Sequence, residues 1–99
     1  MSSTLTDTDI PALPRGVRLR EDAARGGWVL LAPERVLTLD PIAVAVLQEL
    51  DGTRDFGAIV AALAEKYAAP AETIAVDART FIEGLMDKRM VEIAAGGTV

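Results

Sequence analysis

The sequence predicts an α+β domain, with a three-stranded antiparallel sheet followed by three helices, similar to a winged helix-turn-helix. Two observations support this fold class. Residues 17–39 contain short apolar runs that alternate with polar residues or end at turn residues, which is typical of strands. Residues 40–88 instead repeat apolar residues at helical spacing, after residues that commonly start helices. Because the strands precede the helices, we expect the helices to cover one face of the sheet.

The three strands are predicted from alternation and from the turns between them. Val17–Glu21 places apolar and polar residues on opposite faces, as in a half-buried strand, and Trp28–Ala32 is apolar on both faces, as in a central strand. Gly26–Gly27 provides the permissive backbone of the first turn. Pro33–Glu34 suits the second turn, because proline presets φ for a type I turn, and Arg35–Leu39 forms the third strand. Short connections favour an antiparallel meander whose first and third strands lie at the edges.

Aspartate precedes each of the first two predicted helices. Asp40 should accept hydrogen bonds from the free amides at the start of the first helix. Pro41 suits the first helical position, because an N–H there would have no partner within the helix. Gly52 is placed to end this helix as a left-handed cap, and Asp55 caps the second helix. The third helix is expected from about Ala71 to Lys88. The apolar stripes predicted to form the core are Ile42, Val46, Leu47 and Leu50, then Phe56, Ile59, Val60, Leu63 and Tyr67, then Ile74, Ala78, Phe81, Ile82 and Leu85.

The folded domain is expected to span residues 15–93. Residues 1–14 are polar, lack a pattern and contain two prolines, which indicates a flexible N-terminal tail. Residues 94–99 are expected to form a C-terminal tail in the same way. Just before that tail, Val91–Ile93 is either a short final strand or a frayed end.

The composition gives catalysis few candidates. The chain contains no cysteine and no histidine, so it lacks a thiolate nucleophile and the commonest general base and metal ligand. The carboxylate pairs Glu21–Asp22 and Asp51–Asp55 could in principle do acid–base chemistry. They stand at turns and helix starts, however, where carboxylates usually have structural roles. We therefore predict that the protein is not an enzyme and has no catalytic residue, metal site or cofactor.

The charge balance argues against nucleic acid and membranes as partners. Fifteen acidic residues face ten basic ones, and the net charge of −5 repels phosphate backbones and anionic lipid headgroups. No apolar run is long enough to span a bilayer, and the first ten residues lack the features of a signal peptide. The cytoplasm is the expected location.

A DNA-binding regulator is the alternative that the fold class suggests, because the last helix of a winged helix-turn-helix enters the major groove. A helix that binds phosphates would carry clustered basic residues. The exposed charges predicted for the third helix and its end are mixed instead: Asp77, Glu83 and Asp87 against Arg79, Lys88 and Arg89. This alternative is therefore disfavoured.

A series of residues in a fixed order and spacing resembles a known family. The series begins with LLAPERV at Leu30–Val36, continues through Ala43–Leu47 and Asp51–Gly52, and ends on the second and third helices. Its other members are Leu39, Ile59, Leu63, Tyr67, Ile74, Asp77, Phe81 and Leu85. Together these residues resemble the PqqD family over roughly Leu13 to Ile93.

The resemblance to PqqD implies a function that the fold class alone does not. PqqD proteins are small peptide-binding proteins of pyrroloquinoline quinone (PQQ) biosynthesis. Their fold is similar to the recognition element of many ribosomal-peptide (RiPP) modification systems, which binds the leader of a precursor. The family thus implies a non-catalytic adaptor, or peptide chaperone, that binds the precursor peptide PqqA and presents it to the radical-SAM enzyme PqqE. An alternative is a segment of a fusion, because PqqD-like segments also occur joined to neighbouring pathway enzymes.

The resemblance, together with strand chemistry, predicts where a peptide binds. An edge strand presents unpaired N–H and C=O groups, which an extended peptide can complete as an added strand. In related domains the peptide pairs with the third strand and packs against the third helix. The third strand of this chain contains no proline and no lysine to blunt its edge. The strand residues assigned to peptide binding are Arg35, Val36, Leu37, Thr38 and Leu39, with Thr38 facing outward.

One flank of the third helix is assigned to the peptide groove. Ala75, Arg79, Ile82 and Met86 lie on one side of the buried stripe, and this side stays apolar further out than the opposite side. We assign these four residues to peptide binding; alternatively, Ile82 and Met86 only widen the core. Asp77, on the opposite side, is expected to have a capping or hydrogen-bonding role.

Overall fold

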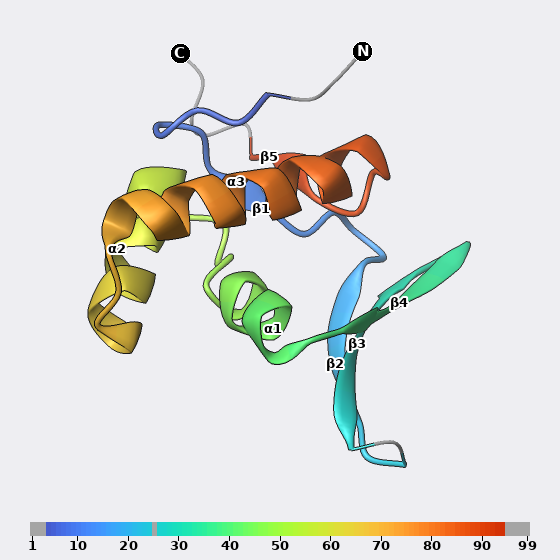
Figure 1. Ribbon diagram of the computed structural model, residues 1–99. Coiled ribbons are helices and arrows are strands. Elements are labelled where there is room, and N and C mark those ends of the chain that lie inside the picture. Colours follow the sequence, from blue (N-terminus) through green and yellow to red (C-terminus); the bar gives the residue numbers. More distant parts are fainter. Residues whose placement is uncertain (1–3, 25, 95–99) are drawn as a thin grey trace.

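A computed structural model describes residues 4–24 and 26–94 of the chain. Its elements in chain order are β1 (Pro11–Ala12), β2 (Arg18–Asp22), β3 (Gly27–Ala32), β4 (Arg35–Leu39), α1 (Pro41–Gln48), α2 (Phe56–Tyr67), α3 (Ala71–Asp87) and β5 (Glu92–Ile93). Strands β2, β3 and β4 form an antiparallel sheet, and α1 lies between this sheet and the other two helices (Figure 1). The predicted α+β class, three strands followed by three helices, is confirmed.

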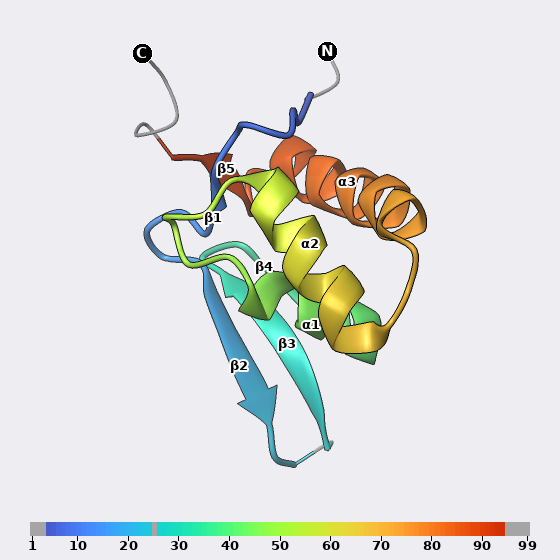
Figure 2. The ribbon, with the colours of Figure 1, turned by 90° about the vertical axis from the view of Figure 1, so that its left-hand side faces the viewer.

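The sheet is a meander with β3 in the centre. Leu19, Leu30 and Leu37 lie side by side across its three strands, and Leu30 is fully buried. Because alternate side chains of a strand point to opposite faces, this row places Leu37 and Leu39 on the helix-facing side, where both pack against the core. The far end of the β2–β3 hairpin extends away from the helices (Figure 2).

Both predicted N-caps are confirmed. Asp40 Oδ1 accepts a hydrogen bond from the Ala43 amide at 2.7 Å, and Asp55 Oδ1 accepts one from the Ala58 amide at 2.9 Å. The predicted role of Gly52 is wrong, because α1 already ends at Gln48. Gly52 has a φ of +79°, so it needs the left-handed backbone for the loop after the helix rather than for the helix cap.

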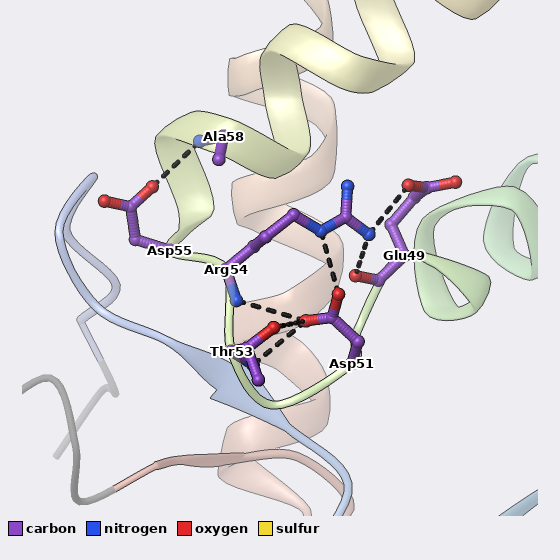
Figure 3. A network of polar contacts seen from close by, with 6 residues as sticks. All are labelled: Glu49, Asp51, Thr53, Arg54, Asp55 and Ala58. Carbon is purple, nitrogen blue, oxygen red and sulfur yellow. Dashed lines mark hydrogen bonds and ion pairs between the residues drawn. The ribbon is translucent and has the colours of Figure 1, made fainter.

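That loop is fixed by the carboxylate of Asp51 (Figure 3). Asp51 accepts hydrogen bonds from the backbone amides of Thr53 and Arg54, from the Thr53 hydroxyl and from Arg54 Nε, at 2.9–3.1 Å. Arg54 also binds the carboxylate of Glu49 at 3.0 Å. The amides of Thr53 and Arg54 are the main reason why the pKa of Asp51 lies well below its ordinary value. Asp51 and Asp55 are therefore structural residues of a turn and a cap.

The core lies between the sheet and the helices and includes the predicted residues Leu47, Phe56 and Ile59. Two predicted core residues are exposed instead: Ile42 is 73% exposed and Tyr67 is 55% exposed. They stand in the first turn of α1 and at the last residue of α2, where these helices reach beyond the packed interior. Within the described residues, no helix is long and apolar enough to cross a bilayer.

An N-terminal segment, residues 5–12, packs on the helices where we predicted a flexible tail over residues 1–14. Leu5 is 1% exposed and belongs to the core. The first two amides of α2, those of Phe56 and Gly57, donate to the backbone carbonyls of Asp9 and Asp7 at 2.8 and 2.9 Å. These bonds satisfy amides that the helix itself leaves unpaired.

The segment ends in β1, which pairs with β5 and so ties the two ends of the domain together. The strand form of the two possibilities predicted for Val91–Ile93 is thus the one observed, at Glu92–Ile93. Residues 1–3, and the predicted C-terminal tail beyond Ala94, lie outside the described residues.

Candidate functional site

The outer edge of β4 is unpaired within the described part of the chain, because the sheet order places β4 beside β3 alone. The two-residue turn at Pro33–Glu34 makes Ala32 and Arg35 the first pair of the hairpin, and such a pair is hydrogen-bonded. Alternation along the strand then directs the backbone groups of Leu37 and Leu39 toward β3. The backbone N–H and C=O groups that face the open edge belong to the residues between them, Val36 and Thr38.

The side chains of β4 divide between two faces. Leu37 and Leu39 are half-buried on the helix-facing side, whereas Thr38 is exposed and Val36 is 60% exposed on the opposite side. Arg35 is exposed at the start of the strand. All five residues that we assigned to the edge therefore lie on one edge strand, and the backbone groups of two of them, Val36 and Thr38, face its open side.

An apolar groove opens directly after β4. It has a volume of about 680 Å³ and lies between α1, the end of α2 and the first half of α3. Asp40, the residue that follows β4, is part of its lining. Grooves that bind small ligands or peptide side chains have volumes of this order and mostly apolar walls. The residues that form the walls here include Ile42, Val46, Leu63, Ile74, Ala78 and Phe81.

The groove lies on the flank of α3 opposite to the one that we predicted. On the predicted flank, Ile82 is fully buried and is therefore a core residue, as the alternative interpretation held. Ala75 and Met86 are half-buried and pack against the core. The Arg79 side chain binds the N-terminal segment: its guanidinium donates to the Leu5 carbonyl and to the Asp7 carboxylate, the latter at 2.7 Å. The N-terminal segment thus occupies part of this flank.

Other contacts support this arrangement. The Arg79 guanidinium lies over the Phe56 ring at 4.8 Å from the ring centre, and Glu83 accepts a hydrogen bond from the Leu5 amide at 2.8 Å. A peptide that contacts Arg79 would therefore have to displace the segment from it. On the other flank of α3, Ile74, Asp77 and Phe81 line the open groove.

Three groove residues were missed or misplaced by sequence reasoning. Ile42 and Tyr67 were assigned to the core, because an apolar residue that lines a groove has the same helical spacing as one that is buried. Asp77 was expected to cap a helix or to form a hydrogen bond. It lies exposed in the middle of α3, beside the groove, and its side chain has no hydrogen bond or ion pair within the described residues.

The site therefore consists of an open strand edge followed by an apolar groove. In the described residues, no group of three or more Cys, His, Asp or Glu side chains is placed to hold a metal ion. Two carboxylates that could have done acid–base work, Asp51 and Asp55, lie in the α1–α2 loop and not in the groove. The chemistry that this site offers is the binding of an extended chain with apolar side chains.

Comparison with known proteins identifies similar chains. Residues 27–91 match the family model for coenzyme PQQ synthesis protein D (PqqD). A PqqA binding protein of Rhizobium meliloti (strain 1021) is 52% identical over 89 residues, which cover 90% of this chain and 91% of that protein. A PqqA binding protein of Rhodopseudomonas palustris (strain TIE-1) is 47% identical over 85 residues, covering 86% of this chain and 83% of that protein.

Two solved structures are also similar. One is the solution NMR structure of the PqqD truncation of Methylobacterium extorquens PqqCD, described as a functional and stand-alone RiPP recognition element. Its TM-score is 0.79 at 44% identity, and the match covers 90% of this chain and 95% of that chain. The other is the crystal structure of PqqD from Xanthomonas campestris, with a TM-score of 0.55 at 45% identity, covering 88% of this chain and 97% of that chain.

Proposed function

The chain belongs to the PqqD family, and we propose that it is a non-catalytic adaptor of PQQ biosynthesis that binds the precursor peptide PqqA and presents it to the radical-SAM enzyme PqqE. The observation that carries this proposal is the unpaired edge of β4 followed by the apolar groove. The names of the relatives, PqqA binding proteins, support PqqA as the peptide.

In this proposal PqqA adds to the sheet as a further strand beside β4. Its backbone pairs with the outward groups of Val36 and Thr38, and a part of it that continues past Leu39 reaches the groove. The affinity comes from burying apolar side chains and from a few backbone hydrogen bonds, each worth about 0.5–1.5 kcal/mol net. Allowing for the entropy of ordering the peptide, we expect a Kd of about 1 µM or below.

The adaptor would act on the reaction by raising the effective concentration of PqqA near PqqE. The absence of cysteine and histidine from the whole chain supports a role without catalysis of its own. The mixed charges of α3 support a role without nucleic acid, because Glu72, Asp77 and Asp87 face solvent on the helix that would enter DNA.

The experiment is a pair of titrations at physiological salt, one with labelled PqqA and one with random duplex DNA. We expect saturable peptide binding and no duplex binding. The chain alone should leave PqqA unmodified, whereas PqqE with reductant and S-adenosylmethionine should modify PqqA faster when the chain is added. Salt-sensitive duplex binding without peptide binding would contradict the proposal.

A further inference from the structure

Asp77 is a charged residue that the fold does not use. Several other acidic side chains have a partner in the folded protein. Asp7 binds Arg79, Asp51 binds Arg54, and Glu83 accepts the Leu5 amide. Within the described residues, the Asp77 side chain has neither a hydrogen bond nor an ion pair, and it is exposed beside the apolar groove. Its charge is therefore available to a bound molecule.

The described residues that line the groove are mostly apolar, and the charged ones among them are acidic. Asp40 and Asp77 are the charged residues among those that line it, at the α1 and α3 sides. The Asp40 carboxylate also caps α1, where it accepts the Ala43 amide. Lys66 does not line the groove, although its ammonium group lies 5.6 Å from the ring centre of Tyr67 at the end of α2. A carboxylate next to an apolar wall attracts a cation more strongly than one surrounded by water, because the local dielectric constant is lower.

The neighbours of Asp77 on α3 suit the stem of a long basic side chain. Ile74 is three residues before Asp77 and Phe81 is four residues after it, so both lie beside it on the helix surface. The methylene groups of lysine or arginine pack along such apolar surfaces while their charged ends remain in water. A basic side chain could thus cover Ile74 or Phe81 and bring its cation to Asp77.

We propose that the groove selects a peptide segment in which a lysine or arginine stands two residues from the apolar side chain that fills it, with Asp77 binding the basic group. Two positions apart, the side chains of an extended peptide point to the same side, about 7 Å from each other. The proposal rests on the proposed function, because it specifies which part of a bound peptide the groove recognises. Charge complementarity selects this occupant over an acidic or wholly apolar segment.

The test compares Asp77→Asn with Glu72→Gln in titrations with PqqA. Both variants remove one negative charge from an exposed position of α3, but Glu72 does not line the groove. Asp77→Asn should weaken binding about three- to tenfold and reduce its dependence on salt, whereas Glu72→Gln should bind as the unmodified chain does. Asp77→Glu, which keeps the charge, should restore most of the affinity. Circular dichroism checks that all three variants fold.

A set of PqqA peptides, each with one lysine or arginine replaced by glutamine, completes a double-mutant cycle. One replacement should weaken binding to the unmodified chain and have no further effect on Asp77→Asn. Equal affinities of Asp77→Asn and Glu72→Gln would overturn the inference, as would replacements that act equally on both proteins. Those results leave PqqA binding intact, so they differ from failure of the proposed function, in which the unmodified chain binds no PqqA and both proposals fall.

Discussion

Thr38 of β4 lies opposite Val29 of β3, at a pair where the two strands exchange no hydrogen bonds. Its backbone N–H is therefore directed to the open edge of the sheet, while its side chain is exposed on the face away from the helices. A change at this residue can remove a group that an added strand needs without removing a hydrogen bond between β3 and β4. Substitutions at Thr38 can therefore test the proposed peptide edge without disturbing the β3–β4 hydrogen bonds.

Thr38→Pro should weaken PqqA binding more than tenfold, whereas Thr38→Ala should keep most of the affinity. Proline removes the outward N–H, and its ring obstructs the approach of another strand, while alanine leaves the backbone unchanged. Titration with labelled PqqA measures the affinity of both variants, and circular dichroism shows whether the proline variant folds.

Amide shifts on adding PqqA to the unmodified chain should concentrate in residues 35–39. Shifts that concentrate in β2 instead would place the peptide on the other edge.

Ile42→Glu should weaken PqqA binding by about 1–3 kcal/mol, because it places a charge among the apolar walls of the groove. Val76→Glu is the matched control, since Val76 is also an exposed helical residue, at 65%, but does not line the groove. Neither change should shift the midpoint of thermal unfolding by more than a few degrees, as both side chains are already in water. Equal losses of affinity in the two variants would show that charge, not the groove, matters.

Leu5→Ala should lower the free energy of unfolding by about 2 kcal/mol, because it empties a buried site against α3. Thr8→Ala, an exposed change in the same segment, should cost little. Urea unfolding measures both. PqqA affinity should be unchanged in Leu5→Ala at temperatures where it is folded, since the segment contacts the flank of α3 away from the groove. A loss of peptide binding with unchanged stability would indicate that the peptide uses the Arg79 side after all.

Asp51→Asn should make the free energy of unfolding less dependent on pH in the acid range. The hydrogen bonds of Asp51 depress its pKa in the folded state, so the unfolded state binds a proton there more readily. The stabilisation is complete above the ordinary aspartate pKa, about 4, and is lost progressively as the pH falls below it. Thermal unfolding between pH 7 and pH 2 should show a smaller decline for Asp51→Asn than for Glu65→Gln, which removes a charge without touching this loop. Equal declines in the two variants would contradict the structural role of the Asp51 carboxylate in this loop.

The sequence predicted the elements that depend on nearby residues and missed those that depend on distant ones. The caps at Asp40 and Asp55, and the exact span Arg35–Leu39 of β4, follow from local chemistry and were predicted correctly. Helical spacing located the buried stripe of α3, but both of its flanks are partly apolar, and nothing local indicates which one stays open. One flank is contacted by the N-terminal segment, in which Leu5 is a single apolar residue in a polar stretch. Leu5 packs in the core and its amide donates to Glu83 of α3, a contact between distant parts of the chain that no local pattern predicts.

The return of residues 5–12 to the end of the domain also has a consequence for the order of folding. The contact between Leu5 and Glu83 spans 78 residues, whereas the two hairpins of the sheet close over a few residues each. Closing a long loop costs more chain entropy than closing a short one, so the hairpins and helices should form before the N-terminal segment docks. The same segment should open most readily in the native protein, and amide hydrogen exchange can test this. The amides of Leu5 and Gly57 should exchange well before that of Leu30, and exchange at one common rate would mean that the domain opens only as a whole.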